Sequence, residues 1–197
     1  KRPSWEDMNK AYKEINALSV PQRYTLVGGQ LLEIYNPNNK HTENTCAMQI
    51  SYMLNKNGMF IENYISQRVS KQPAGVKDDF VLVGSDKHNY IVRVETLIKL
   101  FQLENFWGHA DEPYNPKEMT TKQENINFYN NEFSKFDKSG VVAMIISGWN
   151  NAGGHITLWD GANELNKIFL DYDENLYNNY LLYGNAIVTA LYFWELK

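Results

Sequence analysis

The sequence lacks most of the features by which a protein's function is recognised at first sight. Its 197 residues contain a single cysteine, so no internal disulfide can form and one thiol is left to explain. Its longest apolar runs are interrupted by polar residues and fall short of the roughly 18 residues that a membrane span needs. The formal net charge of -4 argues against a general nucleic-acid binder, because such proteins are normally basic. We therefore expect no membrane insertion and no nucleic-acid partner.

Metal and phosphate sites also lack their usual signatures. The acidic clusters at Asp78-Asp79 and at residues 171–175 have no nearby histidine and no calcium-loop alternation, so both are interpreted as solvated loops. The segments "LVGGQ" and "NAGGH" lack the lysine and the following helix of a phosphate-binding loop. We expect neither a metal nor an organic cofactor.

Hydrophobic periodicity predicts helices in the first part of the chain and strands in the second. Ser4 and the acidic residues after it begin a first helix, and the apolar stripe of residues 46–58 predicts another that stops at Asn57-Gly58. Residues 90–104 indicate a short strand that runs into a helix. Antiparallel strands are predicted at 140–149, at 155–170 as a hairpin, and at 186–196. Without a linker or repeat, residues 1–197 are predicted to form one α+β domain.

The lone cysteine stands where a helix is predicted to begin. Cys46 follows Thr42, Asn44 and Thr45, which are capping residues, and would be the second helical residue if Asn44 is the cap. There the unpaired N–H groups and the positive end of the helix dipole favour the thiolate, which is the nucleophile. The same N–H groups could receive the oxyanion of a tetrahedral intermediate. The alternative is a buried structural cysteine, since free cysteine is among the most buried residue types.

One of the four histidines is a candidate base for this thiol. His155 follows the "NNAGG" loop and begins a strand, sharing one face with Thr157 and Trp159. The other three lie in polar, loop-like surroundings and are interpreted as solvated. The alternative for His155 is a structural strand residue whose ring nitrogens are hydrogen-bonded to neighbouring groups and have no catalytic role.

A predicted hairpin supplies a candidate third residue. Asp160-Gly161 favours a two-residue primed turn, which would pair Trp159 with Ala162 and place His155 directly opposite Asn166. An asparagine there could accept a hydrogen bond from the imidazole and fix its tautomer, as in a Cys–His–Asn site. Asp160 is the competing candidate, but five residues of strand separate it from His155 by roughly 16 Å. An ordinary polar strand residue is the alternative for Asn166.

Four segments make the chain recognisable as a whole. They are "TCAMQISYMLNKNG", "YIVRVETLIKLF", "SGVVAMIISGWNNAGGHITLWDG" and "ALYFWEL", in this order. Together they closely resemble the fourth family of type VI secretion amidase effectors, and the resemblance covers essentially the whole chain. The combination of "NTCA" with "SGW" and "GGHITLWDG" is what makes it specific.

The resemblance implies a papain-like, NlpC-type fold, in which a nucleophile-bearing helix packs on an antiparallel sheet that carries the histidine. It implies an antibacterial toxin that hydrolyses the γ-D-glutamyl–meso-diaminopimelate bond of peptidoglycan stem peptides. It further implies delivery by the type VI secretion apparatus into the periplasm of the target bacterium, and a cognate immunity protein in the producer. The nucleophile carries over to Cys46 and the base to His155. The family's third residue is usually an aspartate, so Asn166 would be a departure, as is the missing cysteine pair of some members.

We therefore expect a cysteine amidase in which His155 deprotonates Cys46 and Asn166 orients the imidazole. The groove walls are expected to include Asn44, Thr45 and Trp149. Two alternatives stay open: an acyltransferase that uses an amine in place of water, and a non-catalytic cell-wall-binding module on the same scaffold.

Overall fold

The structure of the protein, a computed structural model, describes residues 1–65, 81–149, 153–171 and 179–197. The predicted loop at Asp78-Asp79 and residues 172–175 of the second acidic cluster lie outside the described residues. The helices are α1 (Trp5–Asn16), α2 (Val20–Val27), α3 (Gly29–Ile34), α4 (Cys46–Lys56), α5 (Val94–Gln102) and α6 (Lys122–Asn131), with short 3-10 turns η1 (Lys40–Thr42), η2 (Ile61–Asn63) and η3 (Phe133–Lys135). The strands are β1 (Val81–Val83), β2 (Asn89–Ile91), β3 (Lys117–Glu118), β4 (Ser139–Ser147), β5 (Gly154–Asp160) and β6 (Ile187–Glu195).

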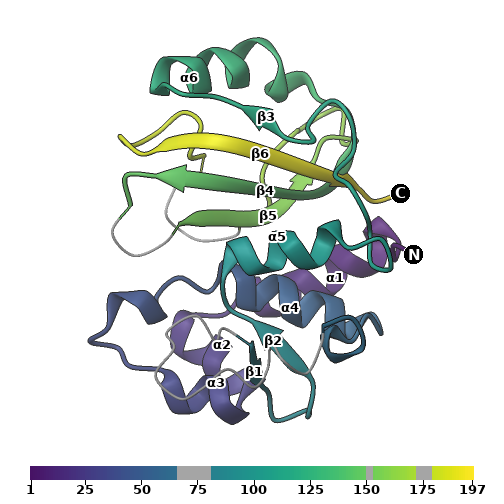
Figure 1. Cartoon of the computed structure of the whole chain (residues 1–197), viewed down its shortest axis with the longest axis vertical. Coiled ribbons are helices and arrows are strands. Elements are labelled where there is room, and N and C mark those ends of the chain that lie inside the picture. The colour runs from purple at the N-terminus through teal and green to yellow at the C-terminus, as the bar shows by residue number, and fades with distance from the viewer. Residues whose placement is uncertain (66–80, 150–152, 172–178) are drawn as a thin grey trace.

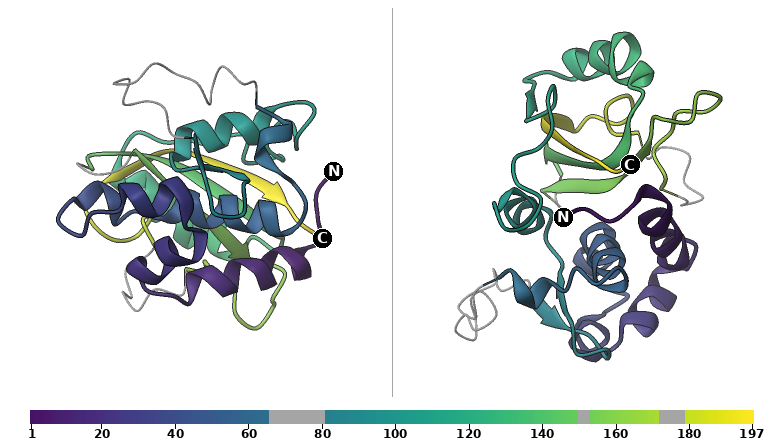
Figure 2. Two further views of the ribbon diagram at one scale, coloured as in Figure 1. Left: turned by 90° about the horizontal axis from the view of Figure 1, so that it is seen from below. Right: turned by 90° about the vertical axis from the view of Figure 1, so that its right-hand side faces the viewer.

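The chain forms a helical part and a sheet part that face each other (Figure 1). Helices α1 to α4 and the two-stranded sheet β1-β2 make up the helical part, while β3-β6-β4-β5 form an antiparallel four-stranded sheet. Helix α6 covers the sheet on the side away from the helical part (Figure 2). The predicted α+β class and the helix-on-antiparallel-sheet arrangement are thus confirmed. No helix of the described chain is both long and apolar enough to cross a membrane.

Helix α4 is the centre of the helical part and begins at the predicted cysteine. Ten of its eleven residues are buried, from Cys46 to Asn55, because α1 packs on one side and β2 and β5 on others. A helix that is enclosed on all sides carries apolar residues around its circumference. It ends as predicted, with Asn57 as the cap and Gly58 at a φ of 76°.

Strand β4 lies in the middle of the large sheet and is apolar on both faces. Val141 and Ala143 belong to the core under α4 and α5, whereas Val142 and Met144 belong to the core under α6. Because both faces are covered, the strand reads as a continuous apolar run instead of an alternating one. The predicted strands at 140–149 and 186–196 are confirmed as β4 and β6.

A buried carboxamide of α6 secures the start of β6. Asn125 is fully buried; its Nδ2 donates to the Val188 carbonyl at 2.9 Å, and its Oδ1 accepts from the Val188 N–H at 2.8 Å. This bridge lies beside the register shift between Ile145 and Ile146 in the β4–β6 ladder, where the backbone groups need another partner.

We expect Asn125→Ala to lower the free energy of unfolding by about 2–4 kcal/mol, because two buried backbone groups lose their partner at once. Urea unfolding followed by tryptophan fluorescence measures the change. The matched control is Asn127→Ala on the exposed side of the same helix, expected to cost less than about 0.5 kcal/mol. Equal effects of the two substitutions would contradict the role given to the Asn125 bridge.

The predicted two-residue hairpin turn at Asp160-Gly161 is wrong. After β5 the chain makes a longer loop over residues 161–167, and the Asp160 N–H donates to the carbonyl of Ile168 at 2.9 Å. Trp159 then pairs with Phe169 instead of Ala162. Asn166 consequently lies exposed in the loop and not opposite His155.

Asp160 and Gly161 do not form a primed turn; they contact the segment of residues 136–139 instead. A Cβ at Gly161 would lie 2.3 Å from the carbonyl oxygen of Phe136, so glycine is required for the close approach of two backbone segments. The Asp160 carboxylate accepts a hydrogen bond from the Ser139 hydroxyl at 3.0 Å, at the end of β5 remote from His155. Asp160 therefore does not support the histidine either.

Candidate active site

A pocket of about 700 Å³ opens where the start of α4 faces β5. Five of the six predicted site residues line it, and Asn166 does not; the five are Asn44, Thr45, Cys46, Trp149 and His155. The pocket therefore brings together predicted site residues that lie up to 111 residues apart in the sequence, from Asn44 to His155. No group of three or more histidine, cysteine, aspartate or glutamate side chains suited to a metal ion occurs in the described part of the chain.

Helix α4 begins one residue later than predicted, with Thr45 as the N-cap, so Cys46 is its first residue instead of its second. The Asn44 carboxamide oxygen accepts a long hydrogen bond, 3.3 Å, from the Cys46 N–H. The sulfur thus lies at the end of a helix whose first N–H groups have no partner within the helix. At 6% exposure Cys46 is buried, yet it lines the pocket.

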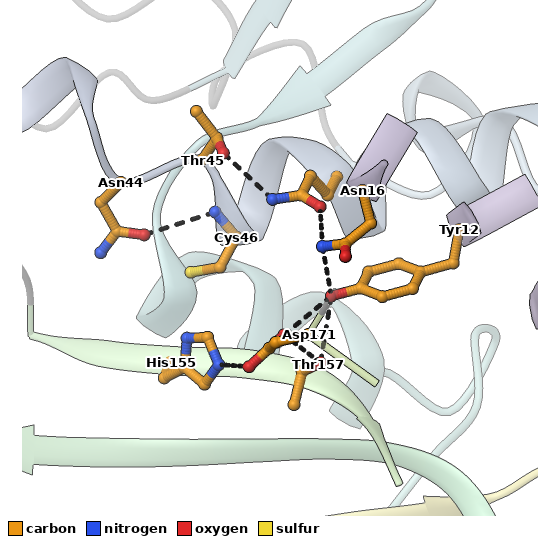
Figure 3. Close-up of polar contacts among 9 residues, drawn as sticks. Tyr12, Asn16, Asn44, Thr45, Cys46, His155, Thr157 and Asp171 are labelled. Atoms are coloured by element: carbon orange, nitrogen blue, oxygen red, sulfur yellow. Dashed lines mark hydrogen bonds and ion pairs between the residues drawn. The ribbon is translucent and has the colours of Figure 1, made fainter. Parts of the chain in front are cut away.

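His155 stands on β5 with its two ring nitrogens facing different partners. Nε2 lies 2.7 Å from Oδ2 of Asp171. The other ring nitrogen, Nδ1, is turned toward the Cys46 sulfur (Figure 3). The edge of the Tyr180 ring packs on the imidazole, with centroids 4.7 Å apart and planes at 74°. His155 itself is 8% exposed, so its contacts with Cys46 and Asp171 are largely shielded from water.

Asp171 is the site residue that the sequence analysis missed. Its Oδ1 accepts hydrogen bonds from the Thr157 hydroxyl at 2.5 Å and from the Tyr12 hydroxyl at 3.0 Å. The side chain is only 9% exposed, so its interpretation as part of a solvated loop is wrong. Continuing the Trp159–Phe169 pairing by two residues puts Asp171 opposite Thr157 and diagonal to His155, within reach of both.

The charges of His155 and Asp171 stabilise each other. Burial acts to lower the pKa of His155, but the Asp171 carboxylate, its hydrogen bond and the contact with Cys46 outweigh it and raise that pKa well above 6.5. Burial acts to raise the pKa of Asp171, but the charge of His155 and the hydrogen bonds from His155, Thr157 and Tyr12 lower it. Their interaction thus favours the imidazolium–carboxylate form of the pair over its neutral form.

A chain of buried hydrogen bonds connects Asp171 to the start of α4 (Figure 3). The Tyr12 hydroxyl, which donates to Asp171, accepts from Nδ2 of Asn16 at 3.3 Å. Asn16 Nδ2 also donates to Oε1 of Gln49 at 2.5 Å, and Gln49 Nε2 donates to the Thr45 hydroxyl at 3.0 Å. Helix α1 thus bridges the acid on the sheet side and the cap of the cysteine helix.

Arg23 completes the chain at its far end. Its Nη1 donates to the Thr45 hydroxyl at 2.9 Å, and its Nε and Nη2 donate to the backbone carbonyls of Ile15 and Asn16. The guanidinium is buried beside the pocket and fixes the end of α1 to the N-cap of α4. A buried nucleophile position, an imidazolium and a carboxylate held by three donors together can perform nucleophilic acyl transfer.

Comparison with known proteins gives a consistent result. The family described as "Type VI secretion system (T6SS), amidase effector protein 4" (Tae4) matches residues 42–192. The Tae4–Tai4 effector–immunity complex from Salmonella Typhimurium contains a similar chain, with 23% identity, 100% of both chains covered and a TM-score of 0.66. The Tae4–Tai4 complex from Enterobacter cloacae gives 27% identity, 100% coverage of both chains and a TM-score of 0.64. Tae4 alone from Enterobacter cloacae gives 27% identity and a TM-score of 0.63, with 100% of this chain and 98% of that chain covered. No curated protein sequence matches the chain.

Proposed function

The chain belongs to the type VI secretion amidase effector 4 family, and we propose that Cys46, His155 and Asp171 are the catalytic residues of its amidase activity. Family membership makes the protein an antibacterial enzyme that acts on peptidoglycan. The observation that carries the residue assignment is the alignment of a helix-terminal thiol, an imidazole and a buried carboxylate 2.7 Å from that imidazole. Asp171 takes the third role that Asn166 was expected to have, so the expected departure from the family's aspartate no longer applies.

In the proposed first half-reaction the Cys46 thiolate attacks the carbonyl carbon of the scissile amide. His155 starts as the imidazolium, because the Asp171 carboxylate favours its charged form. The oxyanion is received by the Cys46 N–H, whose 3.3 Å bond to Asn44 is long enough to be exchanged for a stronger charged one. His155 then gives its proton to the leaving amine, the C–N bond breaks, and a thioester remains on Cys46.

The second half-reaction uses the imidazole that the first one leaves neutral. It removes a proton from a water molecule, whose oxygen adds to the thioester carbonyl. The C–S bond breaks, the acyl group leaves as a carboxylic acid that gives its proton to solvent, and the thiolate–imidazolium pair is restored. Asp171 keeps its charge throughout and holds the ring in place.

The proposed substrate bond joins the γ-carboxyl of D-glutamate to meso-diaminopimelate. A stem peptide around this bond carries both carboxylates and an ammonium group. The pocket has charged walls of both signs, supplied by Arg23 and Glu43, beside the polar residues Asn44 and Thr45. Such walls suit a charged, branched peptide better than an apolar one.

We further propose that the type VI apparatus delivers the protein into the periplasm of a target bacterium, where peptidoglycan is accessible. The similar chains occur in effector–immunity complexes, which supports a cognate immunity protein as the natural partner of this chain. Such a protein would protect the producer by covering the pocket.

Digestion of the free tetrapeptide L-Ala–γ-D-Glu–meso-diaminopimelate–D-Ala tests the proposed bond. Mass spectrometry should find L-Ala–D-Glu and diaminopimelyl–D-Ala as the two products. Removal of the terminal D-Ala alone, or cleavage after L-Ala, would contradict the bond assignment. Expression in a diaminopimelate-containing bacterium should cause lysis when the protein is directed to the periplasm and not when it stays in the cytoplasm.

Tyr12 is expected to act as a positioning residue for Asp171. Tyr12→Phe removes one of the donors to the Asp171 carboxylate, so we expect kcat to fall about tenfold with little change in KM. Asp171 also loses a bond that lowers its pKa, so the acid limb of the rate profile should move to higher pH. Steady-state cleavage of the tetrapeptide between pH 4 and 9 measures both effects.

The matched control is Tyr52→Phe, which also removes a hydroxyl that donates to a carboxylate, that of Glu14 at 2.8 Å. Tyr52 does not line the pocket, and this variant should keep kcat within about twofold. A Tyr12→Phe enzyme whose kcat and acid limb match those of Tyr52→Phe would remove Tyr12 from the site.

A further inference from the structure

A second hollow, of about 510 Å³, adjoins the active-site pocket. Its lining residues are Gly148, Trp149, Tyr180, Tyr183, Gly184, Asn185 and Ala186, which we call the aromatic hollow. Trp149 and Tyr180 line both spaces, so the hollow continues the pocket instead of standing apart from it. Ring contacts of 4.7 Å lead from His155 to Tyr180, and of another 4.7 Å from Tyr180 to Trp149.

The loop that carries Tyr180 and Tyr183 is anchored to helix α6. The Lys122 Nζ of α6 donates to the carbonyls of Tyr180, Tyr183 and Ala186 at 2.7, 2.9 and 2.9 Å. Three bonds from one ammonium fix the backbone of this loop before any ligand binds. Tyr183 is 45% exposed, so its ring is accessible to a ligand in the hollow.

The chemistry of the hollow differs from that of the neighbouring pocket. Among the described residues that line it there is no charged side chain, only three aromatic rings, small residues and one carboxamide, Asn185. The active-site pocket, in contrast, has Arg23 and Glu43 in its walls. A charged stem peptide fits the pocket, whereas a neutral ring with C–H faces and an acetamido group fits aromatic faces and a carboxamide.

We propose that the aromatic hollow is a subsite for an N-acetylated hexopyranose, the sugar of the glycan strand to which the stem peptide is attached. This inference rests on the proposed function. On the acyl side of the scissile bond, D-glutamate, L-alanine and a lactyl ether separate the reacting carbonyl from the sugar. At about 3.3–3.6 Å per residue this segment spans roughly 10 Å, the order of distance that the two successive ring contacts cover. The amidase would thus bind peptide and glycan together.

Two substrates and one residue test the subsite. The substrates are the free tetrapeptide and the same tetrapeptide on its disaccharide, each assayed for kcat/KM. Wild type should prefer the disaccharide substrate by about tenfold, and Tyr183→Ala should reduce this ratio to about one, as expected for one lost stacking contact. Tyr183 lies outside the active-site pocket and its carbonyl remains for Lys122, so the free tetrapeptide reports separately on catalysis. Tyr183→Phe, which keeps the ring, should retain the preference.

The outcomes separate the two proposals. Equal kcat/KM for both substrates in wild type, or an unchanged ratio in Tyr183→Ala, would overturn the sugar subsite and leave the amidase assignment intact. A preference that requires a cross-linked second stem peptide and no disaccharide would also overturn it, because the hollow would then bind peptide. Failure to cleave either substrate would overturn the proposed function and, with it, this inference.

Discussion

Cys46→Ala is expected to abolish cleavage of the stem peptide, with a fall in kcat of about 10⁴-fold or more. No other thiol exists in the chain, so nothing can replace the nucleophile. Chromatography of muropeptide digests measures the loss. The change removes one buried sulfur and should cost only about 1 kcal/mol of folding free energy, so the variant remains folded.

Cys46→Ser serves as the control for shape. It keeps a hydroxyl at the first residue of α4 but not a thiolate, and it should be nearly as inactive as the alanine variant. Circular dichroism and thermal unfolding of both variants should match wild type closely. Cleavage by Cys46→Ala at more than about 1% of the wild-type rate would contradict a covalent mechanism through this residue.

Asp171→Asn is expected to lower kcat by about 10²-fold or more, whereas Asn166→Ala should stay within about twofold of wild type. The carboxamide removes the charge that stabilises the imidazolium, and its NH₂ group can face Nε2 of His155, which favours the wrong tautomer. Asn166 is exposed in the loop after β5, so its removal leaves the site unchanged. The same tetrapeptide assay compares both variants, and reversed effects would restore the Cys–His–Asn reading.

The pH profile of Asp171→Asn gives an independent check. In wild type the carboxylate raises the pKa of His155 well above 6.5, so the imidazolium persists to high pH and activity falls only when it loses its proton. Without that charge, burial lowers the pKa of His155 and only the contact with Cys46 is left to raise it. The basic limb of kcat/KM should therefore move to lower pH in the variant. A basic limb that stays at the wild-type position would show that Asp171 does not act on His155.

Features encoded locally were predictable from the sequence. The start of α4 followed to within one residue from capping residues ahead of an apolar stripe, and its end followed from Asn57-Gly58. The position of His155 at the beginning of a buried strand followed from the glycine-rich segment before it. Each of these signals lies within a few residues of the feature that it specifies.

The partner of the histidine was not predictable in the same way, because it depends on the register between two segments. Asp160-Gly161 has the composition of a primed turn, but its glycine is required by the backbone of Phe136, which lies far away in sequence. The resulting loop is longer than a two-residue turn and shifts the register, so that Trp159 pairs with Phe169. Asp171, instead of Asn166, therefore lies next to His155. A usable signal was the short apolar run "IFL" directly before Asp171, which is typical of a strand that ends at a polar site.

The buried chain of hydrogen bonds from Tyr12 to Thr45 was equally unpredictable, since it joins side chains of two separate segments, α1 and the start of α4. Asn16 and Gln49 have ordinary positions on helices, and only the packing of α1 against α4 brings them within hydrogen-bond distance. Once buried, these groups must find polar partners, and here they find one another.

The most direct test of the central claim is to trap the acyl-enzyme. The tetrapeptide is digested in the presence of hydroxylamine, which competes with water for a thioester, and the products are identified by mass spectrometry. Wild type should release the γ-hydroxamate of L-Ala–D-Glu together with the free acid, and Cys46→Ala should release neither. Free acid alone from wild type, or the same products from Cys46→Ala, would contradict hydrolysis through a thioester on Cys46.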